Sequence, residues 1–356
     1  MSEKDMIQCK GYSAQDPKSV LKPAEFIRRS PSPYDISMDI LYCGVCHTDL
    51  HQVRNEWNGT LYPCMPGHEI IGRVTSVGNK VTKFNVGDVS GVGCMVDSCQ
   101  HCENCNSGLE QYCLNGGPIY TYNSPEKGFD RPTFGGYSNE MVVTERFVVK
   151  IPENMDLKAT APLLCAGITT FSPMQHWKVM AGQKVGVVGI GGLGHLAVKI
   201  SKALGASITA FTSSPQKMSD ATRLGAEQVF LETDDQAIKK MARTFDFIIS
   251  TIPQAYDINP YLEMLKVDGT FVNVGAMDRL EPGINGWALA SSRHSLAGST
   301  IGGMPETQEV INFCSERGIK ADVEVIPIQK INEAFERIKS RDVRYRFVID
   351  MSSLTP

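Results

Sequence analysis

Four cysteines lie close together in the segment SCQHCENCNSGLEQYC, with the spacing C-x2-C-x2-C-x7-C. These are Cys99, Cys102, Cys105 and Cys113. Four thiolates can surround one tetrahedral zinc ion, and such a closed shell is structural because no position stays open for substrate. Iron–sulfur clusters also use four cysteines, but this spacing matches neither common ferredoxin pattern. We expect a structural Zn2+ here, and we expect the neighbouring Cys94 to be a small buried residue rather than a fifth ligand.

A second set of candidate ligands is spread along the chain. Cys46, His68 and Cys165 could supply two thiolates and one imidazole, the donor set of zinc sites that keep a fourth position open for chemistry. Taken singly, a cysteine among leucines or a histidine before a glutamate is ordinary core or polar structure. The spacing also leaves open which cysteine of CGVC is the ligand. The segments are CGVCHTDLH (43–51), GHE (67–69) and LLCAGIT (163–169).

A glycine-rich turn follows an apolar strand in VVGIGGLGH. It has the form G-x-G-x-x-G at Gly189, Gly191 and Gly194, and a helix is expected to begin at its end. Glycines allow the tight turn and a close approach of the backbone to a pyrophosphate, while the helix N-terminus favours the anion. In this strand–turn–helix context the motif predicts a dinucleotide site.

The residues that follow the next strand distinguish the two nicotinamide cofactors. NAD enzymes place an acid there to bind the ribose 2′-hydroxyl. This chain has no Asp or Glu from 206 to 217 and instead has Thr212, Ser213, Ser214 and Lys217. Hydroxyls and an ammonium group accept a 2′-phosphate, which a carboxylate would repel. We therefore expect NADP(H), although a serine before a helix can also be a simple N-cap.

Two regions of different character position these groups. Up to about residue 157 the chain shows short strands, such as 141–151, between Gly/Pro turns, with a Gly-, Pro- and Tyr-rich loop over 115–136. The next region alternates strands and helices, including a helix over 214–224, which predicts a parallel sheet covered on both faces. The last residues return to a mixed pattern and could rejoin the first region.

Composition restricts the class of protein. The chain has 356 residues, 42% hydrophobic and 21% charged, with a formal net charge of -4, so neither nucleic acid nor an anionic membrane is an expected partner. The N-terminus has no signal-peptide core, and no segment reaches the ~20 apolar residues of a membrane helix. Eleven cysteines in a long chain indicate metal binding rather than a disulfide scaffold. We expect a cytoplasmic protein.

Together these motifs resemble the zinc-containing medium-chain alcohol dehydrogenases, and more narrowly the cinnamyl alcohol dehydrogenases and broad-specificity bacterial aldehyde reductases. The resemblance covers nearly the whole chain. It includes CGVCHTDLHQVRNEW (43–57), YPCMPGHEIIGRV (62–74), the four-cysteine segment, APLLCAGITT (161–170), VGIGGLGH (188–195), GSTIGGMPET (298–307) and DVRYRFVID (342–350).

The resemblance implies an α/β fold with a β-rich GroES-like catalytic domain and a Rossmann NADP-binding domain with a doubly wound parallel sheet. The catalytic domain would be discontinuous, over 1–157 and 297–356, and the Rossmann domain would span 158–296. A homodimer is common in this family. Two Zn2+ ions per subunit, one catalytic and one structural, are expected.

The resemblance also assigns roles to single residues. Cys46 becomes the ligand from CGVC, together with His68 and Cys165, and Glu69 an exchangeable ligand. Thr48 would hydrogen-bond the substrate oxygen, His51 would form the outer end of a proton relay, and Asp49 would steady a ligand. The cofactor would contact His47, Thr169, Gly192, Leu193 and Val274 in addition to the glycines and hydroxyl residues above, and the substrate pocket would include Trp57, Met95 and Ile301.

The expected reaction is hydride transfer between a nicotinamide ring and a carbonyl carbon, which interconverts a primary alcohol and an aldehyde. Two other classes remain as alternatives. One is a nucleotide-binding protein without turnover, and the other is a reductase of a conjugated alkene or iminium, which would not need both Thr48 and His51. A cysteine hydrolase is disfavoured because no oriented base can be named for Cys165.

Overall fold

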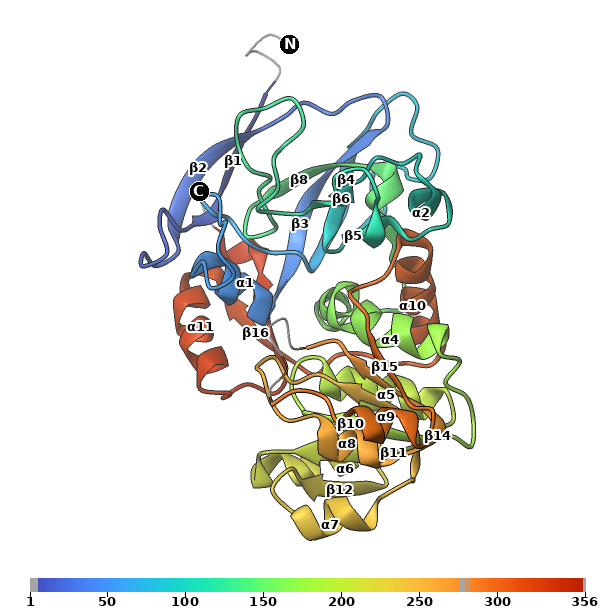
Figure 1. The fold of residues 1–356 in the computed structure, drawn as a ribbon. Coiled ribbons are helices and arrows are strands. Elements are labelled where there is room, and N and C mark those ends of the chain that lie inside the picture. Colours follow the sequence, from blue (N-terminus) through green and yellow to red (C-terminus); the bar gives the residue numbers. More distant parts are fainter. Residues whose placement is uncertain (1–5, 276–279, 281, 355–356) are drawn as a thin grey trace. The chain divides into compact units, whose positions relative to one another are not determined.

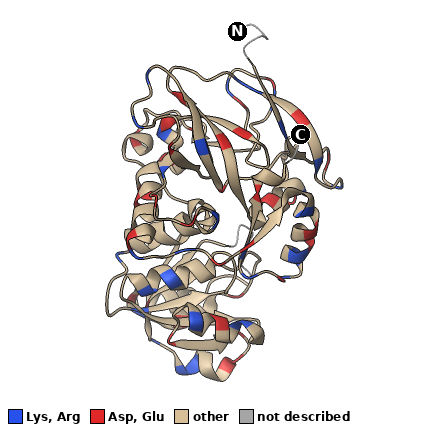
Figure 2. Cartoon of the chain, turned by 180° about the vertical axis from the view of Figure 1, so that it is seen from behind, with Lys and Arg blue, Asp and Glu red and all other residues tan. Residues whose placement is uncertain are grey.

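The computed structural model describes residues 6–275, 280 and 282–354. By its internal contacts the chain forms two compact units, Met1–Cys165 with Gly302–Pro356, and Ala166–Ile301. The domain boundaries drawn from the sequence stay a prediction. Within the described residues, no helix combines the length and apolar character needed to cross a membrane. Figure 2 shows basic and acidic residues interspersed in each unit, without one large patch of either sign in that view.

The first unit is built on a seven-stranded sheet of order β16-β17-β3-β4-β5-β9, with β8 also pairing with β3. Its central strand β3 is buried along most of its length, as expected for a strand covered on both faces. Figure 1 shows strands from both ends of the chain in this unit. The strands are β3 (Asp35–Val45), β4 (Ile70–Val77), β5 (Val89–Val92), β8 (Glu140–Thr144), β9 (Val149–Lys150), β16 (Val323–Pro327) and β17 (Arg346–Asp350).

Smaller elements complete the first unit. Two antiparallel pairs stand outside the large sheet, β1 (Ile7–Ser13) with β2 (Lys22–Arg28), and β6 (Met95–Asp97) with β7 (Ile119–Tyr120). The α-helices are α1 (His47–Val53), α2 (Glu103–Asn106), α3 (Leu157–Thr160), α10 (Met304–Glu316) and α11 (Ile331–Lys339). The 3-10 turns are η2 (Glu110–Tyr112), η3 (Glu145–Phe147), η4 (Ala161–Leu164), η6 (Ile328–Lys330) and η7 (Met351–Ser353).

The second unit is a six-stranded, fully parallel sheet of order β12-β11-β10-β13-β14-β15. The order runs outward in both directions from the β10–β13 pair, the arrangement of a doubly wound nucleotide-binding sheet. The strands are β10 (Lys184–Val188), β11 (Ser207–Thr212), β12 (Gln228–Leu231), β13 (Phe245–Ser250), β14 (Leu265–Asn273) and β15 (Ser295–Gly298). The helices are α4 (Ala166–His176), α5 (Gly194–Ala203), α6 (Met218–Leu224), α7 (Asp235–Lys240), α8 (Asn259–Glu263) and α9 (Gly286–Ala290), with the turn η5 (Pro215–Lys217).

Aromatic packing fills one face of this parallel sheet. Phe211 contacts Phe245 and Tyr261 edge to face, with ring centroids 6.0 and 5.6 Å apart. Phe271 lies in the same buried cluster. Such ring pairs add to the burial of apolar area and fix the register of helices on the sheet. The α/β fold class predicted from the sequence is confirmed.

Several local expectations were wrong. The segment 141–151 is not one strand, because the turn η3 separates β8 from β9. The helix expected over 214–224 begins as the 3-10 turn η5, with Pro215 at its first position, and becomes α-helical at Met218. The loop 115–136 contains the short strand β7, which pairs with β6.

Candidate active site

Strand register brings three of the predicted metal ligands together. In the antiparallel pair β3–β4, Cys43 lies opposite Ile70, so the end of β3 adjoins the start of β4. The N–H of Gly44 donates to the carbonyl of Glu69 at 2.9 Å. Cys46 follows β3 directly, and His68 precedes Glu69 at the entry to β4. Residues far apart in the sequence therefore become neighbours through one strand pair.

Cys165 reaches the same place from the turn η4, which ends at Leu164. This turn packs on β5, where glycines leave room for it. A Cβ added to Gly93 would lie 2.8 Å from the Leu164 carbonyl, and one added to Gly91 would lie 2.9 Å from the Leu164 side chain. The close packing of η4 on β5 fixes the position of Cys165.

The donor atoms of Cys46, His68, Glu69 and Cys165 all lie within 4.8 Å of one another, and all four residues are buried. The two Sγ atoms are 4.0 Å apart, and His68 Nε2 lies 3.2 Å from Cys165 Sγ. Two thiols and an imidazole nitrogen at these separations fit a tetrahedral zinc ion. The hydrogen bond with Cys165 has the largest effect on the pKa of Cys46 and lowers it, while burial acts in the opposite direction.

Asp49 orients two of these ligands from behind. Its Oδ2 accepts the backbone N–H of Cys46 at 2.8 Å and the hydroxyl of Tyr137 at 3.1 Å. Its Oδ1 accepts the N–H of Gly67 at 3.1 Å and lies 3.2 Å from His68 Nδ1. A carboxylate behind a metal-binding histidine fixes the ring and leaves Nε2 to face the ion. Asp49 therefore contacts the ring of one predicted ligand and the backbone of another, and its role in steadying them stays a prediction.

Glu69 forms a buried ion pair with Arg346, the first residue of β17. Arg346 Nη2 lies 3.0 Å from Glu69 Oε1, and both side chains are excluded from solvent. Burial raises the pKa of Glu69, and the charge of Arg346 opposes this rise. Sequence reasoning did not predict this contact.

Cys94 differs from its prediction. It is partly exposed rather than buried, and it is not among the four grouped cysteines. Its thiol instead interacts with Cys165, whose hydrogen bond is the first cause that lowers the pKa of Cys94. The physical reason is the position of Cys94 next to Gly93, on which η4 packs.

Helix α1 carries the predicted proton-transfer residues. His47, Thr48 and His51 are all half-buried, and Thr48 and His51 lie three positions apart, hence on one face of the helix. The rings of His47 and His51 stack with centroids 4.7 Å apart. Burial, followed by the nearby His51, lowers the pKa of His47.

The outer end of this helix contacts a carboxylate that sequence reasoning missed. His51 Nδ1 forms an ion pair with Glu56, which is exposed. Trp57 also contacts His51, with ring centroids 5.0 Å apart, and is 43% exposed. A histidine between a half-buried threonine and an exposed acid can exchange protons with solvent.

The three residues predicted to line a substrate pocket do not all belong to one unit. Trp57 and Met95 belong to the first unit and Ile301 to the second. Met95 is buried, and Ile301 is half-buried with a φ of 40°. Their assignment to one substrate pocket stays a prediction.

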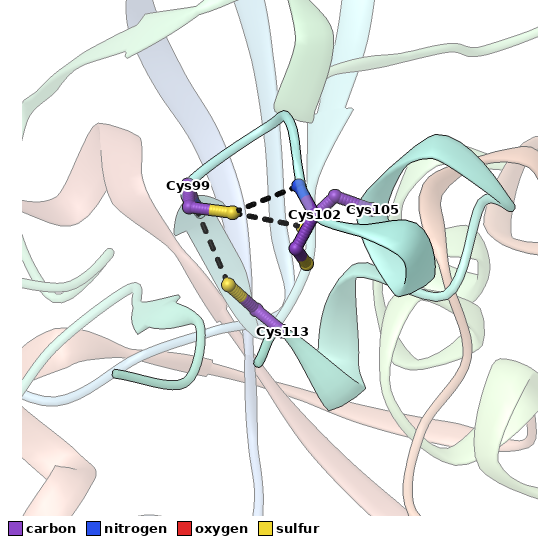
Figure 3. A group of neighbouring side chains, drawn as sticks. All are labelled: Cys99, Cys102, Cys105 and Cys113. Atoms are coloured by element: carbon purple, nitrogen blue, oxygen red, sulfur yellow. Dashed lines mark hydrogen bonds between the residues drawn. The ribbon is translucent and has the colours of Figure 1, made fainter. Parts of the chain in front are cut away.

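The four grouped cysteines converge as expected from their spacing. Their Sγ atoms lie within 4.8 Å of one another, around the turn that leads into α2 and η2 (Figure 3). Backbone N–H groups point at the sulfurs: those of Cys102 and Cys99 donate to Cys99 Sγ at 3.3 Å and Cys113 Sγ at 3.5 Å. Such donors stabilise thiolates. The pKa of Cys99 is lowered to about 6, and the hydrogen bond from the backbone of His101 has the largest effect. The donor set fits a closed zinc site.

The nucleotide turn lies at the carboxyl edge of the parallel sheet. Gly189, directly after β10, has a φ of 86°, which favours glycine. A Cβ on Gly194 would lie 1.9 Å from the Gly189 carbonyl, so the turn closes tightly on the start of α5. A Cβ on Gly191 would meet nothing within 4 Å, which leaves open space on that side. The loop, with Gly192 and Leu193 between, therefore fits the backbone cradle of a pyrophosphate.

The remaining cofactor candidates are also in the second unit. Thr212 ends β11 and Val274 follows β14, and both strands end at the same edge as β10 because the sheet is parallel. Ser214 N–H donates to the Thr212 hydroxyl at 3.2 Å, and Ser213 lies between them. Lys217 ends η5. Thr169 is buried in α4.

Sequence reasoning missed three side chains beside the open metal cluster. Tyr137 donates to Asp49, Tyr122 stacks on His68 with centroids 5.7 Å apart, and Arg346 faces Glu69. The tyrosines flank or lie in the loop 115–136, so its length and composition were the available signal. For Arg346 the signal was a charge placed within an apolar C-terminal strand.

The fold and the two clusters define a dehydrogenase, and comparisons with known proteins agree. Residues 32–153 match the alcohol dehydrogenase GroES-like domain, and residues 192–316 match the zinc-binding dehydrogenase domain. The chain is 50% identical to aldehyde reductase YahK of Escherichia coli over 347 residues, 97% of each chain.

Two solved structures are similar over nearly their whole lengths. A cinnamyl alcohol dehydrogenase from Sorghum bicolor has a TM-score of 0.92 and 42% identity, covering 97% of this chain and 98% of its own. A cinnamyl alcohol dehydrogenase from Helicobacter pylori, complexed with NADP(H), has a TM-score of 0.90 and 39% identity, covering 98% and 99%. The chain belongs to the zinc-binding medium-chain alcohol dehydrogenase family, and it is an alcohol/aldehyde oxidoreductase.

Proposed function

We propose that this protein is a zinc-dependent, NADP(H)-linked enzyme that interconverts primary alcohols and aldehydes and acts mainly as an aldehyde reductase on aromatic or other bulky aldehydes. One observation carries the proposal: Cys46, His68 and Cys165 converge with their donor atoms within 4.8 Å, beside Thr48 and His51. This donor set is that of a catalytic rather than a structural zinc site.

The roles of the metal ligands follow from the donor chemistry. Cys46, His68 and Cys165 would hold a catalytic Zn2+, and Cys99, Cys102, Cys105 and Cys113 would hold a structural one. When bound at the open site, zinc supplies Lewis acidity toward an oxygen of the substrate. The chain supports its ligands through Asp49, which fixes the His68 ring, and through the backbone of η4, which carries Cys165.

The cofactor preference rests on the second unit. NADP(H), when bound, supplies or accepts the hydride. The open side of Gly191 would accept its pyrophosphate, and the hydroxyls of Thr212, Ser213 and Ser214, with the Lys217 ammonium, would receive its 2′-phosphate. No carboxylate lies between 206 and 217 to repel that phosphate. The relative from Helicobacter pylori complexed with NADP(H) supports this preference.

Proton transfer would run along α1. The Thr48 hydroxyl would hydrogen-bond the substrate oxygen and pass its proton toward His51, which is partly exposed and paired with Glu56. Glu56 would hold the His51 ring in place through its contact with Nδ1. His47, kept neutral by burial, would face the cofactor.

The substrate class is inferred from pocket candidates and relatives. Trp57, Met95 and Ile301 would give an apolar pocket that accepts an aromatic ring. Relatives named aldehyde reductase and cinnamyl alcohol dehydrogenase support this class.

The test is a rate comparison. Initial rates of NADPH and NADH oxidation are measured with aliphatic, terpenoid and phenylpropanoid aldehydes, with a conjugated alkene that lacks an aldehyde as a control. We expect aldehyde reduction with NADPH, lost in Cys46→Ser and His68→Ala at unchanged circular dichroism. Wild-type rates in both variants, or reduction of the alkene alone, would contradict the proposal.

A homodimer is part of this proposal. The strand β15 ends the sheet order of the second unit and pairs there with β14, so its outer edge can accept another strand. Trp287, in the neighbouring helix α9, is 77% exposed, which is unusual for so large an apolar side chain. Light scattering that gives the mass of one subunit would overturn this part of the proposal.

A further inference from the structure

Arg346 and Glu69 are a buried pair of opposite charges next to the open metal cluster. Arg346 is 5% exposed and Glu69 is fully buried, and Arg346 Nη2 lies 3.0 Å from Glu69 Oε1. The strand β17 brings the arginine there, since Phe347 lies opposite Val45, next to Cys46. The C-terminal strand thus places a positive charge at the metal ligands.

The Glu69 carboxylate makes no hydrogen bond within the described part of the chain. Neither of its oxygens has a hydrogen-bond partner among the described residues, because the contact with Arg346 is an ion pair whose alignment falls short of a hydrogen bond. Gly44 makes room for the carboxylate, since a Cβ there would lie 1.9 Å from Glu69 Oε2. A buried carboxylate without hydrogen bonds is costly unless a charge compensates it.

The same carboxylate lies within reach of a metal ion. Its oxygen is within 4.8 Å of the donor atoms of Cys46, His68 and Cys165. Two cations therefore compete for one carboxylate: the guanidinium of Arg346 and the ion. If Glu69 bound the ion instead of pairing with Arg346, it would complete a closed four-ligand shell. A closed shell leaves no position for a substrate.

We propose that Arg346 is a positioning residue that holds Glu69 off the ion and so keeps the fourth ligand position free for an outside ligand. This inference rests on the proposed function, because it requires a metal at the open cluster. Arg346 acts through Glu69 and does not itself touch the ion or the substrate. Its effect should therefore vanish when Glu69 can no longer bind as a carboxylate.

The experiment measures access to the fourth position without turnover. Enzyme loaded with Co2+ at the open cluster is titrated with imidazole, and binding is followed by the visible absorption of cobalt. In Arg346→Met, Glu69 occupies the fourth position, and we expect the Kd of imidazole to rise roughly 10- to 100-fold, the usual effect of losing such a supporting residue. In the double variant Glu69→Gln/Arg346→Met the Kd should return toward that of the wild type.

Arg73→Met is the matched control. Arg73 is an exposed arginine on β4, the strand that Glu69 precedes, and it donates to the carbonyl of Gly87 at 3.0 Å. Its replacement should leave imidazole binding unchanged. Should Arg346→Met not fold, Arg346→Lys takes its place, with a smaller rise in Kd that the Glu69→Gln change must again remove.

The outcomes separate this inference from the proposed function. An unchanged imidazole Kd in Arg346→Met, or a weakened one that Glu69→Gln does not restore, would overturn the role of Arg346. If instead wild-type protein took up no more cobalt than Cys46→Ser, the proposed metal at the open cluster would itself be absent.

Discussion

Replacement of Asp49 by asparagine tests how the metal ligands are held. The change keeps the size of the side chain and removes one negative charge. In the wild type, one oxygen accepts from Cys46 N–H and the Tyr137 hydroxyl, and the other faces Gly67 N–H and His68 Nδ1. An asparagine oxygen can still accept from Gly67 N–H and face His68 Nδ1. The NH2 group of the asparagine then faces Cys46 N–H and the Tyr137 hydroxyl.

The cost follows from those contacts. The Tyr137 hydroxyl can turn and accept, but the Cys46 N–H cannot, so one buried donor loses its partner at about 1–3 kcal/mol. The bonds to Gly67 and His68 lose their charge assistance, a difference of about 1 kcal/mol each. We expect Asp49→Asn to lower the free energy of unfolding by about 3–5 kcal/mol in total, and to weaken metal binding or turnover roughly 10- to 100-fold.

Urea unfolding followed by tryptophan fluorescence, to which Trp57 of the same unit contributes, measures the stability change. Competition with a chelator measures metal affinity. Asp39→Asn is the control, because Asp39 is an exposed carboxylate on β3 that lies near the like-charged Glu140. It should cause no loss of stability. If Asp49→Asn unfolds and binds metal as the wild type does, Asp49 does not orient His68 as we argue.

Three further predictions concern other parts of the chain. Lys217→Glu should raise the KM for NADPH more than that for NADH, roughly tenfold for a lost charge-assisted contact; equal effects on both KM values would show that Lys217 does not contact the 2′-phosphate. Cys113→Ser should lose one zinc per subunit by elemental analysis and lower the urea midpoint, because a structural ion contributes to folding directly; full zinc content would refute the closed site. Burial, and then the charge of Asp39, raises the pKa of Glu140. The protonated side chain contributes stability below the unfolded pKa of 4.5, and this contribution is lost as pH rises through the folded pKa. Glu140→Gln should therefore be more stable, relative to the wild type, at pH 8 than at pH 4. The expected difference is at most about 1 kcal/mol, because the group is half-exposed. If the unfolding midpoint of Glu140→Gln differed from that of the wild type by the same amount at pH 4 and at pH 8, this prediction would be contradicted.

The sequence carried the local signals of this fold well. Strands such as Lys184–Val188 are apolar throughout because both faces of a parallel sheet are buried, and the glycine turn that follows is visible as a motif. The four-cysteine cluster is equally local, since its donors come from one short segment.

Contacts between distant segments were harder to predict. The pairing of β17 with β3 brings Arg346 to Glu69, and no local pattern encodes which strand a C-terminal segment joins. Tyr122 and Tyr137 contact His68 and Asp49 from a segment that periodicity does not describe. The scattered residues Cys46, His68 and Cys165 were proposed from their donor types, but the choice of Cys46 within CGVC came from the family resemblance. Their proximity depends on strand register and on the packing of η4, which local spacing does not encode.

Metal content is the most direct test of the central claim, that a second metal site with an open ligand position exists beside Thr48. Elemental analysis of the purified protein should find two zinc ions per subunit in the wild type. Cys46→Ser should retain one, keep its circular dichroism spectrum and lose NADPH-dependent aldehyde reduction. One zinc in the wild type and an unchanged content in Cys46→Ser would contradict the account.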